Sequence, residues 1–83
     1  MTLGGKSGID ELFEPAGKFM IASGESLIGN IQREYKIGYN RASRIMDQLT
    51  EQGVIGPDEG EFKPRKILMS MQQFEYLCEQ LRP

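Results

Sequence analysis

Two helical patterns separated by a short turn constrain this chain more than any other feature of its sequence. The shorter of the two helices follows Ser26, a residue type that favours the N-cap position. Its inward-facing apolar residues are Leu27, Ile28, Ile31 and Tyr35. The second helix is predicted from about Tyr39 to Gln52, and Lys-Ile-Gly at 36–38 forms the turn before it. A short helix, a turn that contains glycine and a longer helix are the parts of a helix-turn-helix.

The longer helix has two unlike faces. Its apolar arc is made of Ala42, Ile45, Met46 and Leu49, whereas Asn40, Arg44, Asp47 and Glu51 lie on the opposite side. Asparagine can pair with the adenine edge and arginine with the guanine edge in the major groove, so Asn40 and Arg44 are suited to neighbouring bases. Asp47 can accept from a cytosine amine or hold Arg44 in place. An ordinary amphipathic helix with a solvated face is the commoner origin of this pattern, so the surrounding sequence has to decide.

The segments on either side complete a fold. Asp10 is predicted to cap a first helix that closes at Ser23 and Gly24, with its regular part beginning near Pro15. After Gly53, a short strand at 54–55, a turn at 56–60 and a returning strand at 66–69 predict a β-hairpin. Ser70 and Gln73 form a capping box for a last helix that reaches the end of the chain.

The order of these elements predicts a fold class. Three helices, a hairpin and a C-terminal helix make a mainly α protein with a small β-hairpin (α+β), in the arrangement of a winged helix-turn-helix. This domain is expected to span residues 9–83. Residues 1–8 contain three glycines and are expected to be a flexible linker or a remnant of cloning.

The basic residues are clustered although the net charge is −2. Two short stretches, 33–44 and 63–66, hold seven of the ten basic residues. A domain with such a dipolar charge can bind phosphates on one face, with modest and salt-dependent affinity. The residues expected to contact a DNA backbone are Arg33, Lys36, Tyr39, Arg41, Lys63, Arg65 and Lys66. A solvated hairpin surface is the alternative for the second cluster.

The composition excludes several functions. The chain has no histidine and a single cysteine, Cys78, so it offers no imidazole zinc site, no histidine-based catalysis and no internal disulfide. We therefore expect no metal, no cofactor and no enzymatic activity. No apolar run approaches the roughly 20 residues that span a membrane, and no signal peptide opens the chain, so a cytoplasmic location without membrane contact is expected.

Four stretches of the sequence carry a resemblance to a known family. They are IGYNRASRIMD at 37–47, GVIGP at 53–57, KPR at 63–65 and DELF at 10–13. Together they closely resemble the C-terminal gamma domain of the FtsK and SpoIIIE DNA translocases. The resemblance implies a winged helix that binds double-stranded DNA, recognises short polarised sequences in the chromosome and directs the motor during chromosome segregation and cell division. It also implies, for some members, contact with a XerD-type recombinase.

The resemblance also assigns roles to residues. Base reading in the family uses an asparagine, an arginine one turn on and an acid one turn beyond, which correspond to Asn40, Arg44 and Asp47. Gly17 and Gly29 depart from the family in helices where other residues are usual, and Asp47 is shorter than the usual glutamate. The ATPase motor of the full-length family is not part of these 83 residues, and full-length members are membrane-anchored through a separate N-terminal region.

Two other functions stay open from the sequence. One is a protein-interaction module that docks on a recombinase or on the motor through its first or fourth helix. The other is a free-standing winged-helix regulator. Binding to duplex DNA at low salt distinguishes the first from a DNA reader, and an ATPase sequence upstream in the gene distinguishes the second.

Overall fold

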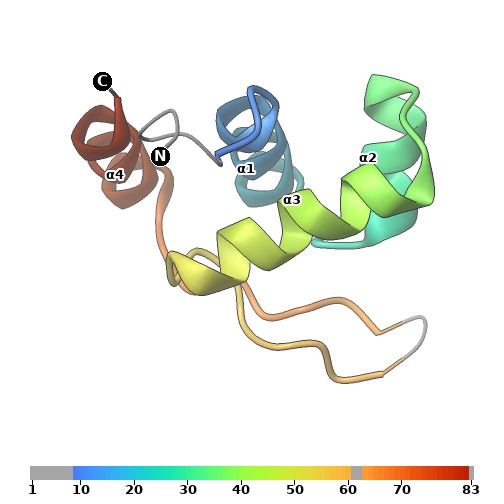
Figure 1. Ribbon diagram of the computed structural model, residues 1–83. Helices are drawn as coiled ribbons and strands as arrows, with labels where there is room; N and C mark the ends of the chain where they lie inside the picture. The colour runs from blue at the N-terminus through green and yellow to red at the C-terminus, as the bar shows by residue number, and fades with distance from the viewer. Residues whose placement is uncertain (1–8, 61–62, 83) are drawn as a thin grey trace.

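A computed structural model describes residues 9–60 and 63–82, and this part of the chain forms four helices. They are α1 (Phe13–Ser23), α2 (Ile28–Tyr35), α3 (Tyr39–Glu51) and α4 (Met71–Leu81). In Figure 1, α3 runs beneath α1 and α2, and α4 lies beside α1 at the end remote from α2. The mainly helical class is confirmed, and the linker predicted at 1–8 lies outside the described residues.

The hydrophobic core lies where the inward faces of the helices meet. The predicted apolar arc of α3 is confirmed, since all four of its residues are buried. The buried apolar residues are Phe13, Ala16, Met20, Ile31, Ala42, Ile45, Met46, Leu49, Val54, Ile55, Phe74 and Cys78. Because α3 buries one complete side, its opposite side is held facing outward.

Helix α4 packs closely against α1 through an aromatic side chain. A methyl group built on Gly17 would come 2.2 Å from Cζ of Phe74, so the ring lies directly on the backbone of α1. The ring of Phe13 lies 5.8 Å from that of Phe74, centroid to centroid. The glycine that departs from the family pattern is therefore required by the ring above it. The predicted capping box of Ser70 and Gln73 is confirmed.

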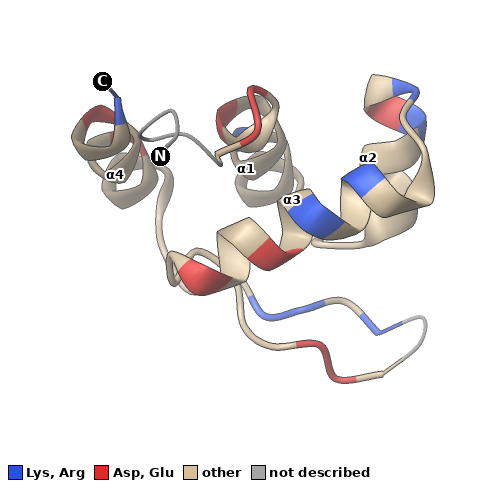
Figure 2. Cartoon of the chain, viewed as in Figure 1, with Lys and Arg blue, Asp and Glu red and all other residues tan. Residues whose placement is uncertain are grey.

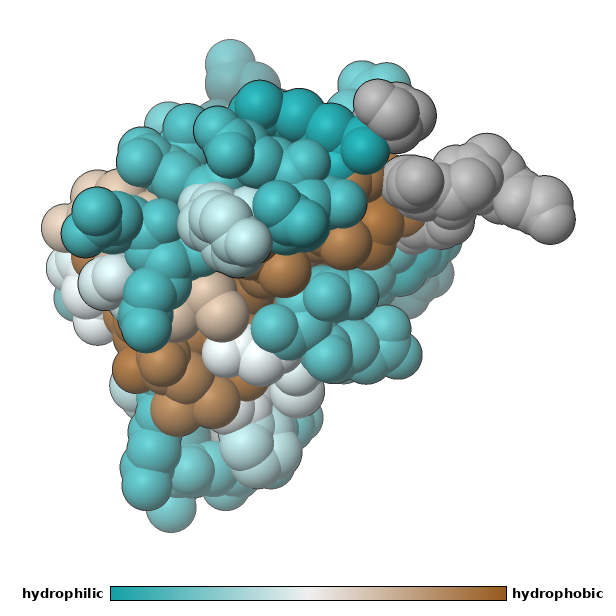
Figure 3. Space-filling model, turned by 90° about the vertical axis from the view of Figure 1, so that its left-hand side faces the viewer, coloured by the Kyte–Doolittle hydropathy of each residue, from teal (hydrophilic) through white to brown (hydrophobic). Residues whose placement is uncertain are grey.

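The surface around α4 is mainly polar. Figure 3 views this end of the molecule and shows hydrophilic residues over most of it, with hydrophobic residues reaching the surface between them. Tyr76 of α4 is 66% exposed, and Leu68, just before α4, is 55% exposed. Burial of Cys78 raises the pKa of its thiol, which keeps this cysteine in its neutral, unreactive form.

The predicted β-hairpin is wrong. Within the described residues, the two limbs meet at one isolated antiparallel bridge between Ile55 and Ile67. Two backbone hydrogen bonds, of 2.7 and 2.9 Å, flank this bridge. Pro57 lies two positions after the bridge on one limb and Pro64 three positions before it on the other. In the register set by these bonds, Pro64 lies opposite Asp58 at the next hydrogen-bonded pair, and because proline has no N–H to donate, the ladder cannot extend regularly to that pair.

Two predicted helix caps are also wrong. Helix α1 has Leu12 as its N-cap, and the carboxylate of Asp10 instead accepts from the Leu12 N–H at 2.9 Å. Pro15 falls in the first turn of α1, where its missing N–H leaves no helical bond unmade. Helix α2 has Leu27 as its N-cap, because the hydroxyl of Ser26 is buried and donates to the carbonyl of Arg65.

Candidate nucleic-acid interface

The outward face of α3 presents the three residues predicted to read bases. Asn40 and Arg44 are exposed, and the side chain of Asp47 is 65% exposed. Asn40 and Arg44 make no hydrogen bond or ion pair with any described residue, so their polar groups are available to a ligand. The structure therefore brings these three side chains to one face, and the positive charge of Arg44 also helps to lower the pKa of Asp10.

Below α3 lies a segment that we call the connecting segment, residues 56–60 and 63–66 (Figure 1). Its outgoing limb carries Asp58 and Glu59, and its returning limb carries Lys63, Arg65 and Lys66. In the view of Figure 2, the basic limb runs nearer to α3 than the acidic limb does. The basic residues are thus on the limb that lies nearer to the predicted reading helix in this view.

A groove of about 820 Å³ is lined by α3, by this segment, and by α2 with the two residues before it. It is lined by residues of all three elements, among them Arg33, Tyr39, Asp47, Lys63 and Arg65. Four of the seven residues predicted to contact a DNA backbone are thus brought together around one hollow. The aromatic ring of Tyr39 is 62% exposed at its rim.

The other predicted backbone contacts lie elsewhere. Lys36 and Lys66 are exposed and are not among the residues that line the groove. Lys36 holds the left-handed conformation (φ 53°) that ends α2, whereas Gly38 keeps an ordinary negative φ of −78°. Arg33, inside the groove, donates a hydrogen bond to the Asn30 side chain one turn before it.

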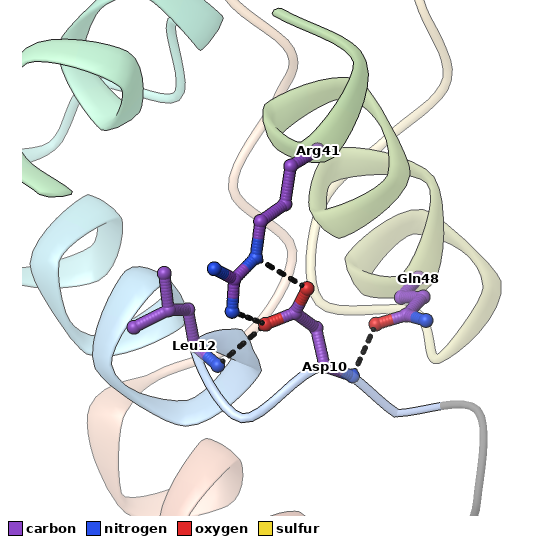
Figure 4. Close-up of polar contacts among 4 residues, drawn as sticks. All are labelled: Asp10, Leu12, Arg41 and Gln48. Carbon is purple, nitrogen blue, oxygen red and sulfur yellow. Dashed lines mark hydrogen bonds and ion pairs between the residues drawn. The ribbon is translucent and has the colours of Figure 1, made fainter. Parts of the chain in front are cut away.

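Arg41 is held by an acid rather than left free. Its Nε and Nη2 donate to the two carboxylate oxygens of Asp10 at 2.9 and 2.8 Å (Figure 4). The Asp10 N–H in turn donates to Oε1 of Gln48 at 2.9 Å. Asp10 therefore fastens the chain that enters α1 to the flank of α3, and Arg41 has two of its donors committed to that contact.

Arg65 is drawn inward as well. Its side chain is only 12% exposed, and its Nη1 donates to Oγ1 of Thr50 at 2.9 Å. The same nitrogen lies 3.6 Å from Asp47, and Nη2 lies 3.9 Å from Asp58. The sequence gives no indication of these contacts, because Thr50 and Arg65 are fifteen positions apart and belong to different elements.

The Asp10 contact makes stability depend on pH. The hydrogen bond from Arg41 lowers the pKa of Asp10, and hydrogen bonds from Lys18 and Arg82 lower the pKa of Glu14. A folded-state pKa below the unfolded one gives stability that is complete above the unfolded pKa and is lost as the pH falls through the folded pKa. We expect the melting temperature to decline as the pH falls below about 5 and to keep declining below 3.8, the ordinary pKa of Asp10.

Asp10→Asn tests this expectation by thermal melts at several pH values. The variant should melt lower than the original chain at pH 7 and should show a shallower decline on the acid side. Lys66→Gln is the control, because it removes one exposed positive charge that is not among the groups that lower the pKa of Asp10. Equal acid-side slopes for Asp10→Asn and the original chain would contradict the role given to Asp10.

Other kinds of site have no support in the part of the chain that is described. No cluster of three or more metal-binding side chains is found there. None of the four helices described is both long and apolar enough to cross a membrane.

Comparison with known proteins gives a consistent result. The family model described as "Ftsk gamma domain" matches residues 7–70. The DNA translocase SpoIIIE of Bacillus subtilis is 38% identical over 68 residues, which cover 82% of this chain and 8% of that protein. The DNA translocase FtsK of Streptococcus pyogenes serotype M1 is 46% identical over 67 residues, covering 81% of this chain and 8% of that protein.

A third relative, the DNA translocase FtsK of Staphylococcus epidermidis, is 44% identical over 66 residues, or 80% of this chain. The chain spans about 8% of the length of each of these relatives. The matched family residues end at 70, just before α4 begins.

Proposed function

This chain belongs to the gamma-domain family of the FtsK and SpoIIIE DNA translocases, and we propose that it binds double-stranded DNA in a sequence-specific way. The observation that carries the proposal is the outward face of α3, where Asn40 and Arg44 are exposed and make no hydrogen bond or ion pair with any described residue. Base edges in the major groove offer those two side chains bidentate partners. Asp47 completes the row as a hydrogen-bond acceptor.

In this proposal, residues 9–83 work as a winged-helix domain in which the connecting segment takes the place of the wing. A DNA strand beside α3 would run along the groove, where Lys63 and Arg33 supply positive charge and Tyr39 supplies an aromatic edge. Phosphate contacts fix register, while base contacts specify sequence. In the full-length protein this reading would direct translocation along the chromosome, on the cytoplasmic side.

The first test is a selection of duplexes from a random pool, followed by titration of the selected duplex at several salt concentrations. Lys63→Gln is expected to weaken binding to all duplexes alike and to lower the slope of log affinity against log salt by about one unit. The reason is that a lysine on a phosphate releases one counterion and reads no base. Lys18→Gln, the same charge change on α1 away from the groove, should leave the slope unchanged.

A pool that yields no preferred duplex, together with no binding at low salt, would contradict the proposal. That result would favour a second function, docking on a XerD-type recombinase or on the motor. The observation in its favour is that two large apolar residues are exposed, Leu68 just before α4 and Tyr76 on α4. Single substitutions Leu68→Ser and Tyr76→Ser should leave DNA binding intact if the two surfaces are separate.

A further inference from the structure

Arg65 differs from the other cations predicted to contact DNA. Its side chain is 12% exposed, whereas that of Arg41 is 41% exposed even though it forms a two-bonded pair with Asp10. A phosphate ligand has to turn its charged end outward to meet the DNA. The guanidinium of Arg65 instead points at groups that belong to the protein itself.

The contacts of Arg65 join two sides of the groove. Its Nη1 bonds Thr50 and lies near Asp47, both on α3, while Nη2 lies 3.9 Å from Asp58 on the connecting segment. Its carbonyl accepts from the buried hydroxyl of Ser26 at the entrance to α2. A planar guanidinium donates to several acceptors from three nitrogens in fixed directions, whereas a lysine has one nitrogen with three rotatable donors.

A second hydrogen bond strengthens the same junction. Oγ1 of Thr50, which accepts from Arg65, also donates to the carbonyl of Gly56 at 3.2 Å. Both limbs of the connecting segment are therefore attached to the last turns of α3 through Thr50.

The charges around Arg65 matter for any polyanion in the groove. Asp47 and Asp58 both line it, and their side chains are 65% and 67% exposed. Two carboxylates would repel a phosphate backbone, and the guanidinium between them offsets that repulsion. The same cation limits the directions in which the Asp47 carboxylate can point.

We propose that Arg65 is a positioning residue, which holds Asp47 and the connecting segment in the arrangement that reads DNA, and is not itself a phosphate ligand. This proposal rests on the proposed function for its effect on DNA, and on the contacts above for its effect on the free protein. It replaces the sequence-based expectation that Arg65 contacts the DNA backbone.

The test compares Arg65→Gln, Arg65→Lys, Asp47→Asn and the double variant Asp47→Asn/Arg65→Gln. Each is titrated with the selected duplex and with duplexes that differ from it at single base pairs. We expect Arg65→Gln to reduce discrimination about fivefold or more at the base pair where Asp47→Asn reduces it. The double variant should lose no more discrimination than the more damaging of the two single variants, because both changes disrupt the same interaction.

Arg65→Lys distinguishes the loss of these contacts from the loss of a positive charge. It keeps the positive charge and should therefore keep the salt slope, while losing discrimination as Arg65→Gln does. A uniform loss on all duplexes with a slope lower by about one unit, as expected for Lys63→Gln, would overturn the proposal. Unchanged discrimination in both Arg65 variants would overturn it as well.

Hydrogen exchange in the free protein separates this proposal from the proposed function. The amide of Gly56 donates to Lys66 and that of Leu68 donates to Val54, where the two limbs meet. Both amides should exchange faster in Arg65→Gln, which removes the bond from Arg65 to Thr50, and in Thr50→Val, which removes that bond and the bond from Thr50 to Gly56. Unchanged exchange would overturn the positioning role whatever the DNA result. If the variants exchange faster but the unsubstituted chain shows no sequence preference, the positioning role stands and the proposed function is contradicted.

Discussion

The free energy of unfolding is expected to fall by about 3–5 kcal/mol when Phe74 is replaced with alanine. The ring is fully buried, lies on the backbone of Gly17 and packs against Phe13. Domains are stable by only about 5–15 kcal/mol, so this loss leaves little of the total. Urea denaturation followed by circular dichroism gives the measurement.

Gly17→Ala examines the same contact from the other side. Alanine favours helices over glycine by about 1 kcal/mol, yet its methyl group would meet the Phe74 ring at 2.2 Å. Overpacking of this kind costs about 1–3 kcal/mol, so we expect a net loss of stability. In Gly29→Ala the nearest atom is the Arg33 side chain at 3.5 Å, so this control should be neutral or stabilising. A Gly17→Ala chain about 1 kcal/mol more stable than the original, as helix propensity alone predicts, would show that the ring does not lie there.

The Phe74 contact bears on where the domain ends. The family match stops at residue 70, but Phe74 and Cys78 of α4 are part of the buried core. Arg82, just after α4, adds an ion pair to Glu14 of α1 at 3.1 Å. In this chain, α4 therefore packs on α1 and contributes to the same core as α1 and α3.

Features that depend on local periodicity could be predicted from the sequence. The apolar arc of α3 and the capping box at Ser70 are confirmed because both follow from residues within one or two helical turns. The same holds for the turn between α2 and α3, although Lys36, not Gly38, adopts the left-handed conformation. The base-reading role of Asn40, Arg44 and Asp47 stays a prediction.

Features that depend on distant partners could not be predicted. Asp10 and Ser26 have the residue type of helix caps, but Asp10 binds Arg41, 31 positions away, and Ser26 binds Arg65, 39 positions away. The predicted hairpin is wrong for a different reason, since the strand pattern does not take the prolines into account. A basic cluster likewise says nothing about which of its members turns inward, and Arg65 does.

Replacing Asn40 or Arg44 with alanine is expected to cause a large loss of discrimination between DNA sequences. Each change should cost about 1–3 kcal/mol on the selected duplex and much less on unrelated duplexes, because a bidentate base contact is lost. The two residues lie one helical turn apart, so each should relax preference at its own base pair. Competition among duplexes that differ at one base pair measures this directly.

Stability should not change in these variants, which separates reading from folding. Neither side chain contributes to the core, and surface substitutions of this kind usually stay within about 0.5 kcal/mol. Glu51→Ala, on the same face of α3 but beyond the reading row, serves as the control and should keep both affinity and preference. If Asn40→Ala kept the full preference of the original chain, α3 would not read bases through this row. Binding would then rest on the cations of the groove alone, and its affinity would follow salt rather than sequence.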